Sequence, residues 1–105
     1  MNAVLERPGT TNYSAKNSVK PVNFYFAKPD PDAIAVHLMG DFNGWNPSSL
    51  PMEKRVDGWW FIQVPLAHGH HTYLFVVDGV PTLDPQSAGT VQTDRYAKAS
   101  VIAVS

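Results

Sequence analysis

The 105-residue chain contains no cysteine, which excludes a disulfide framework and any metal site that is built on thiolates. It also contains no uninterrupted apolar run near the roughly 18 residues that a membrane-spanning helix needs. A basic segment followed by an apolar run is missing at the N-terminus, so no signal peptide is predicted. The lack of cysteine is neutral about the compartment, and a cytoplasmic location fits best.

Charge is scarce and is spread along the chain. Eight Lys and Arg residues stand against nine Asp and Glu residues, which leaves a formal net charge of -1. The basic residues form no stripe that could displace counterions from nucleic acid or from an anionic membrane. The sequence therefore predicts neither nucleic acid nor membrane as a partner, and a neutral partner is favoured.

Catalytic patterns are also missing. A glycosidase needs two carboxylates across the scissile bond, and Glu53 is the only glutamate in the part that is expected to fold. Four aspartates occupy predicted turn positions, where Asp is common because its side chain bonds to the backbone; they are Asp41, Asp57, Asp78 and Asp84. The sequence therefore predicts a protein that is not an enzyme and that has no cofactor.

Three histidines, His68, His70 and His71, lie close together near a predicted turn. Imidazoles at this spacing can share a metal ion, but structural zinc needs four suitable ligands. No Cys and no nearby pair of carboxylates completes such a set, so no metal site is predicted.

The composition that remains is typical of one folded domain. Hydrophobic residues make up 44% of the chain and aromatic residues 11%, enough for a packed core. Residues 1–20 are polar and without periodicity, which predicts a flexible N-terminal tail, with a docking peptide as the alternative. Residues 21–105 are predicted to form the domain. The chain begins at Met1 and ends just after the last predicted strand, which favours a free-standing protein over an appendage of an enzyme.

From Pro21 onward, apolar residues recur with a period of two, and no helical period is present. Strands are predicted over residues 22–26, 34–39, 52–55, 59–66, 71–77, 80–83 and 99–104. Short strands separated by frequent turns predict an all-β, antiparallel, immunoglobulin-like sandwich of about seven strands. The predicted core consists of Phe24, Val36, Leu38, Trp60, Ile62, Val64, Tyr73, Phe75, Val77 and Val101.

Two segments carry most of the information. Val36–Asn46 (VHLMGDFNGWN) joins an apolar strand to a polar turn with one tryptophan, and Tyr73–Gly79 (YLFVVDG) is an alternating strand that ends in the hairpin signal Asp-Gly. Together they resemble the glycogen-binding modules of carbohydrate-binding module family 48. Such modules occur in the beta subunit of AMP-activated protein kinase and at the N-termini of isoamylases and glucan branching enzymes. The resemblance runs from about Val22 to Val104 and implies an early-set immunoglobulin-like domain that binds α-glucans without chemistry of its own.

Trp45 is the first candidate for ligand contact. It lies in a loop rich in Gly and Asn, where its flat face suits the C–H face of a glucose ring while the amides of Asn43 and Asn46 bond hydroxyls. The residues alone leave a second interpretation open, in which Trp45 folds back over the sandwich and anchors the loop. The resemblance favours the sugar, because Trp45 matches the tryptophan that ends the family's Gly-x-Phe-Asn-x-Trp motif and stacks on glucose there.

Other positions depart from the family's binding set. The second stacking tryptophan is replaced by Val80-Pro81, the lysine of the Tyr-Lys-Phe strand by Leu74, and the asparagine that opens the last strand falls near Ala99 or Ser100. Two further aromatic residues are candidates to compensate, or are simply structural. These are Trp59, which is predicted to point away from the core, and Tyr96, in the irregular segment before the last strand.

The sequence therefore predicts a non-catalytic module that weakly binds an α-glucan such as glycogen, starch or a maltooligosaccharide. Its candidate site residues are Trp45, Asn43, Asn46, Trp59 and Tyr96. The alternative is a protein-interaction or regulatory module that kept the fold, lost the sugar site, and docks to an enzyme of glucan metabolism or to itself. Retention of the residues 42–45 favours the glucan, and loss of the second tryptophan favours the alternative.

Overall fold

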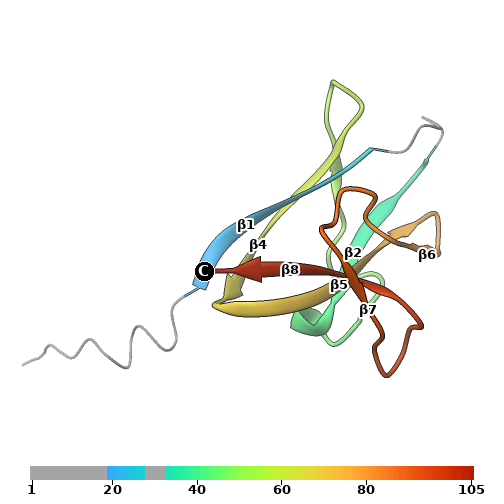
Figure 1. Ribbon diagram of the computed structural model, residues 1–105. Coiled ribbons are helices and arrows are strands. Elements are labelled where there is room, and N and C mark those ends of the chain that lie inside the picture. The colour runs from blue at the N-terminus through green and yellow to red at the C-terminus, as the bar shows by residue number, and fades with distance from the viewer. Residues whose placement is uncertain (1–18, 28–32) are drawn as a thin grey trace, which may run out of the picture.

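The computed structural model describes residues 19–27 and 33–105, which fold into two antiparallel sheets (Figure 1). Residues 1–18, most of the predicted tail, lie outside the described residues, as do residues 28–32. The first strand begins at Val19, slightly before the predicted boundary at Pro21. Within the described residues, no helix is long and apolar enough to cross a membrane.

The smaller sheet contains three strands in the order β1-β4-β3. These are β1 (Val19–Phe26), β4 (Trp60–Ala67) and β3 (Glu53–Lys54). Phe24 pairs with Ile62 in the register of β1 and β4. Because side chains alternate across a strand, this register directs Phe24 and Phe26 to the same face as Trp60 and Val64, and these four side chains are buried.

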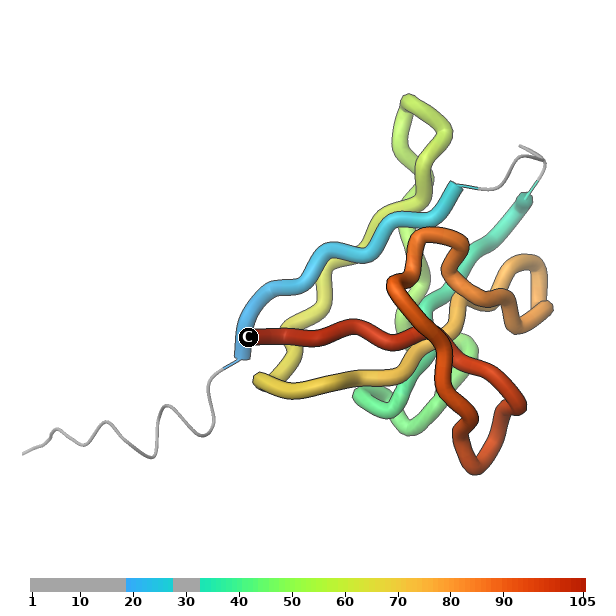
Figure 2. Tube along the Cα trace, viewed as in Figure 1, coloured from blue at the N-terminus to red at the C-terminus, as the bar shows by residue number. Residues whose placement is uncertain are grey.

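The larger sheet contains five strands in the order β2-β5-β8-β7, with β6 also paired to β5. These are β2 (Val36–Gly40), β5 (Gly69–Val77), β8 (Ala99–Val104), β7 (Thr90–Val91) and β6 (Val80–Thr82). In Figure 2 the orange segment between β6 and β8 forms two protruding loops on either side of β7.

The hairpin predicted at Asp78-Gly79 is confirmed. Val77 pairs with Val80, and the two residues between them have φ values of 49° and 85°. Positive φ at both central residues is the mark of a type I′ turn, whose twist matches that of the flanking strands. The Asp78 carboxylate also accepts the backbone N–H groups of Ile34 and Ala35, each at 2.9 Å, and so holds the entry to β2.

The two-sheet architecture confirms the predicted immunoglobulin-like sandwich, with eight strands in the described residues where about seven were expected. The additional strand is β7, which has only two residues and is too short to show an alternating pattern. The other predicted strands are present, with ends that differ by at most three residues.

The core lies between the sheets, and the predicted core residues are buried there except for Ile62 and Val101. Ile62 is partly buried and still packs against the core. The prediction for Val101 is wrong. Its neighbours Ile102 and Val104 pack into the core, and Val101 lies on the opposite face of β8. β8 has apolar residues at almost every position, so its sequence contains no alternation that could define the inner face.

A second, smaller cluster lies on the outer face of the larger sheet. Met39 from β2, Leu74 and Val76 from β5, and Ala99 from β8 are all buried there. Trp45 and Tyr96, which belong to loops, pack against these side chains. The larger sheet is therefore covered on both faces at this end, on one by the core and on the other by two aromatic side chains.

Candidate functional site

The loop that carries Trp45 is held in place by Asn43. After β2, the short 3-10 helix η1 (Asp41–Asn43) turns the chain. The Asn43 Oδ1 atom accepts the N–H of Gly40 at 3.0 Å, and its Nδ2 atom donates to the carbonyl of Asn46 and to Ser49 Oγ, each at 3.0 Å. Both ends of this amide are used inside the loop, so the structure gives Asn43 a bracing role.

Trp45 has an unusual backbone conformation. Gly44 and Trp45 have φ values of 67° and 59°, and the Trp45 N–H donates to the Gly40 carbonyl at 2.9 Å. A non-glycine residue in the left-handed region costs on the order of 1 kcal/mol, and such residues cluster at functional sites. The Asn43 bonds and the Gly40 bond together impose this geometry on a bulky aromatic residue.

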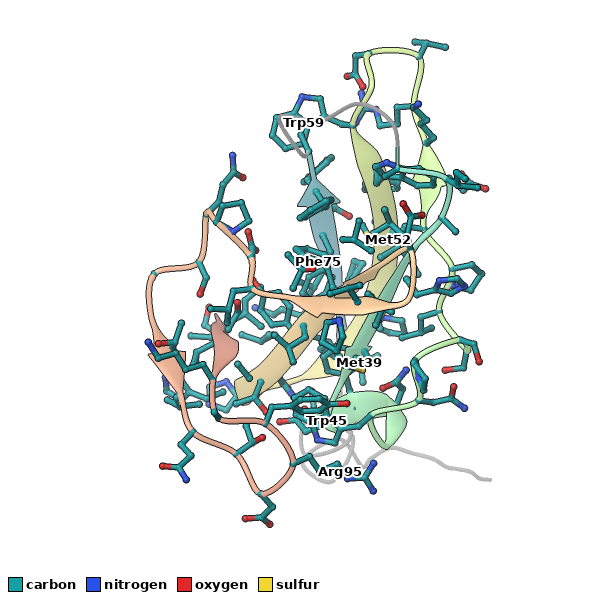
Figure 3. The ribbon with its side chains drawn as sticks, turned by 90° about the vertical axis from the view of Figure 1, so that its right-hand side faces the viewer. Met39, Trp45, Met52, Trp59, Phe75 and Arg95 are labelled. Carbon is teal, nitrogen blue, oxygen red and sulfur yellow. The ribbon has the colours of Figure 1, made fainter. Side chains whose placement is uncertain are left out.

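The indole of Trp45 lies beside the ring of Tyr96. Their centroids are 5.2 Å apart with an interplanar angle of 49°, and both side chains are half-buried on the outer cluster. Thr93 Oγ1 accepts the Tyr96 N–H at 2.9 Å, and the Tyr96 hydroxyl donates to Met39 Sδ at 3.6 Å. Figure 3 shows Trp45 next to Met39, with Arg95 at the same end of the molecule. We call Trp45 and Tyr96 the aromatic pair.

Unused hydrogen-bond donors border the aromatic pair. The Asn46 Oδ1 atom accepts the Ser48 N–H at 2.9 Å and the Ser48 hydroxyl at 3.2 Å. Its Nδ2 group, and the indole N–H of Trp45, make no hydrogen bond to any of the described residues. An aromatic surface with two free donors is an arrangement that can bind a neutral, hydroxyl-rich ligand.

The remaining family positions provide no such groups. Leu74 is 3% exposed and belongs to the outer cluster beneath the aromatic pair. Ala99 and Ser100 are 0% exposed, and the Ser100 hydroxyl accepts the Asp84 N–H at 2.9 Å. Val80, where the resemblance places the second tryptophan, is 61% exposed but is not aromatic. The polar side chains that the resemblance implies are therefore replaced by an apolar floor.

Trp59 lies far from this site. Figure 3 shows Trp59 and Trp45 at opposite ends of the molecule. Four of the predicted site residues come together around one loop end, namely Trp45, Asn43, Asn46 and Tyr96. Trp59 instead lines a separate pocket with Tyr25 and Arg55. The five candidates therefore belong to two different places on the surface.

Sequence reasoning missed the apolar floor of the site, which Met39, Leu74 and Val76 form. A signal was present, because β5 carries apolar residues in both phases of its alternation. Tyr73 and Phe75 point into the core, while Leu74 and Val76 point outward and are equally buried. A strand that is apolar in both phases indicates that both faces of its sheet are covered.

His71 connects the base of the loop to β5. Its Nδ1 atom lies 3.1 Å from Asp41 Oδ1, and its Nε2 atom lies 2.9 Å from the carbonyl oxygen of Ala67. Burial lowers the pKa of His71, but the hydrogen bond to Ala67 and the hydrogen bond and charge of Asp41 outweigh it, so the pKa lies above 6.5. Among the residues that the structure describes, no group of three His, Cys, Asp or Glu side chains could hold a metal ion.

Protonated His71 is expected to stabilise the fold at acidic pH. Because its pKa is raised on folding, this contribution is complete below the unfolded-state pKa of 6.5 and disappears as the pH rises through the folded-state value. The pair remains partly open to water, with side chains 17% and 40% exposed, so we expect no more than about 1 kcal/mol.

This expectation can be measured by NMR titration of the His71 ring and by urea unfolding at several pH values. Asp41→Asn should lower the pKa of His71, and His71→Gln should destabilise the domain more at pH 6 than at pH 8.5. An equal loss of stability at both pH values would show that the charge of His71 contributes nothing.

The family comparison agrees with the fold. Residues 12–97 match the family described as carbohydrate-binding module 48 (isoamylase N-terminal domain). The match covers most of the chain and includes the loop of Trp45 and the segment of Tyr96. The chain therefore belongs to carbohydrate-binding module family 48.

Several branching enzymes contain a stretch similar to part of this chain. The 1,4-alpha-glucan-branching enzyme 1 of Pisum sativum, described as chloroplastic/amyloplastic, is 52% identical over 40 residues, or 38% of this chain and 5% of the enzyme. The 1,4-alpha-glucan branching enzyme GlgB of Pseudoalteromonas atlantica is 50% identical over 40 residues, 38% of this chain and 6% of the enzyme. The GlgB of Bradyrhizobium sp. strain ORS 278 is 39% identical over 49 residues, 47% of this chain and 7% of the enzyme. The similarity thus spans less than a tenth of each of these relatives.

Proposed function

We propose that this family 48 domain is a non-catalytic module that binds α-glucans weakly, through the aromatic pair. The observation that carries the proposal is the conformation of Trp45. Its backbone is held in the left-handed region by the loop, and its half-buried indole lies beside Tyr96 rather than inside the core. Membership of a carbohydrate-binding family and similarity to enzymes named for 1,4-alpha-glucan support the choice of ligand.

The expected binding mode is stacking with a few hydrogen bonds. The C–H face of a glucose ring would cover the exposed part of the Trp45 indole, and the Asn46 Nδ2 group would donate to a hydroxyl. The free energy gained by stacking on one aromatic surface must also offset the translational freedom that the ligand loses and the cost of removing water from its hydroxyl groups. We therefore expect a dissociation constant on the order of 0.1 to 1 mM, equivalent to roughly 4 to 5.5 kcal/mol.

Retention on insoluble starch and quenching of tryptophan fluorescence by maltoheptaose test the proposal. Wild-type protein should be retained weakly and show a saturable change, and Trp45→Ala should reduce both by tenfold or more. Cellulose serves as the ligand control, because it contains the same sugar in a different linkage. Unfolding in urea must accompany the binding data, because Trp45 also packs on the outer cluster.

A protein-interaction or regulatory role is the second candidate. It is favoured by Leu74, Ala99 and Ser100, which leave no exposed polar group at the two positions where the resemblance implies a lysine and an asparagine. In this case the domain would dock to an enzyme of glucan metabolism or to a second copy of itself. Failure of wild-type protein to bind starch, together with a loss of about 3 kcal/mol or more in Trp45→Ala, would identify Trp45 as an anchor and favour this role.

A further inference from the structure

A pocket is lined by Trp59, which lies at the end of the molecule opposite Trp45 (Figure 3). It has a volume of about 350 Å³. Its lining comes from three separated parts of the chain, namely β1, the connection between β3 and β4, and the loop after β6. The lining residues are Tyr25, Arg55, Asp57, Trp59 and Gln86.

The turn between β3 and β4 fixes the position of Trp59. The Arg55 N–H donates to the Trp59 carbonyl at 2.7 Å, and the Gly58 N–H donates to the Arg55 carbonyl at 3.0 Å. The Asp57 Oδ1 atom accepts the Trp59 N–H at 3.0 Å. Three hydrogen bonds within one short turn indicate that this part of the pocket exists before any ligand arrives.

The charges in the pocket compensate each other. Arg55 Nη2 lies 3.6 Å from Asp57 Oδ2, and the Arg55 guanidinium lies 5.8 Å from the centroid of the Tyr25 ring. An anion or a cation would therefore meet its like charge as closely as its opposite. A purely apolar ligand would strip water from both ions, which is costly unless new partners replace it.

Free polar groups complement the aromatic rings. The backbone N–H of Gln86 donates to Asp84 Oδ1 at 2.8 Å, which orients the loop. The side-chain amide of Gln86 and the hydroxyl of Tyr25 make no hydrogen bond to any described residue, and Tyr25 is 38% exposed. Such a mixture of aromatic area, an amide, a hydroxyl and a neutralised ion pair favours a neutral ligand that is rich in hydroxyl groups.

We propose that this pocket binds one terminal sugar ring of an α-glucan chain, with Trp59 as the stacking surface. The volume is near the lower end of the roughly 300–1,000 Å³ typical of ligand pockets, which favours a single ring over a long chain segment. The inference rests on the proposed function only for the identity of the sugar. Because the pocket and the aromatic pair lie at opposite ends, one protein molecule can contact two chains of a branched polymer. Binding at both sites together would raise the overall affinity for the polymer above that of either site alone.

The three tryptophans allow a direct NMR test. Trp45, Trp59 and Trp60 each give one indole N–H signal, and Trp60 is buried in the core, so its signal serves as an internal control. Maltotriose is titrated into ¹⁵N-labelled protein, with cellotriose as the control sugar. We expect the Trp59 signal to shift and saturate, while the Trp60 signal does not move.

Variants separate this pocket from the aromatic pair. Gln86→Ala removes the free amide but keeps the backbone bond to Asp84, and it should weaken the Trp59 response about threefold or more. Val56→Ala, in the same turn and fully exposed, is the matched control and should change nothing. In Trp45→Ala the Trp59 response should persist.

Each outcome supports or overturns a distinct statement. A Trp59 signal that stays fixed while the Trp45 signal shifts overturns sugar binding in the Trp59 pocket and leaves the proposed function intact. A Trp59 shift without a Trp45 shift supports the pocket and contradicts the proposed function of the aromatic pair. If neither signal responds to sugar, both statements are wrong, and association of the Trp59 surface with a protein becomes the explanation to pursue.

Discussion

Replacement of Gly40 by alanine is expected to destabilise the domain by about 3 kcal/mol, at the upper end of the usual cost of overpacking. A Cβ atom on Gly40 would lie 2.5 Å from Cε2 of Phe42 and 2.6 Å from the carbonyl oxygen of Thr72. The φ of Gly40 is -171°, an extended value that any residue adopts, so the cost comes from the overlap. The Phe42 ring can shift, but the Thr72 carbonyl belongs to β5 and cannot move without disturbing the sheet.

The same substitution is expected to weaken glucan binding, because the Gly40 carbonyl accepts the Trp45 N–H and Asn43 accepts the Gly40 N–H. Urea unfolding and starch retention measure the two effects. Gly44→Ala is the matched control, since its Cβ would meet open space and its φ of 67° should cost only about 1 kcal/mol. Equal stability losses in the two variants would show that overlap of the added Cβ atom with Phe42 and Thr72 does not destabilise the domain.

Tyr73→Phe is expected to cost about 2 kcal/mol, in the range for hydrogen bonds to charged groups. The Tyr73 ring belongs to the core, and its hydroxyl donates to Asp84 Oδ2 at 2.5 Å in a partly buried bond. Burial, followed by this hydrogen bond and the charge of Asp84, raises the pKa of Tyr73 above its usual value, so the hydroxyl keeps its proton. Phenylalanine fills the same space but leaves Asp84 Oδ2 without this donor, while Asp84 Oδ1 still accepts the Gln86 N–H.

Tyr25→Phe is the matched control for this prediction. The Tyr25 hydroxyl has no hydrogen-bond partner among the described residues, and removing it should change the free energy of unfolding by less than about 0.5 kcal/mol. Both variants are compared by urea unfolding at neutral pH. If Tyr73→Phe is as stable as Tyr25→Phe, the bond to Asp84 makes no net contribution, and the loop after β6 must be held by other contacts such as Asp84 N–H to Ser100 Oγ.

The position of Trp45 is compatible with both interpretations that the sequence left open. Its indole packs on Met39 and Leu74 as an anchor would, and its edge and part of its surface remain available to a ligand. The family's lysine position holds Leu74 and its asparagine position falls at Ala99 or Ser100, all buried, so the aromatic pair and the Asn46 amide are the main sources of affinity in the proposed site.

Local patterns alone were enough to predict most strands and one turn. Period-two alternation placed Phe24, Trp60 and Phe75 in the core, because successive side chains of a strand point to opposite faces and the apolar face is the one that is buried. The Asp78-Gly79 pair predicted its hairpin, because only residues that tolerate positive φ suit a type I′ turn. The motif around Trp45 was enough to suggest the family to which the chain belongs.

Tertiary structure decided the features that depend on which strands become neighbours. The inner face of β8 could not be predicted, because its residues are apolar in both phases and only pairing with β5 selects Ile102 over Val101. The meeting of Trp45 with Tyr96, and the separation of Trp59 from both, follow from the packing of loops that are distant in sequence. Periodicity reports which side of a strand is buried, but the sheet order and the loop conformations determine which exposed side chains share a surface.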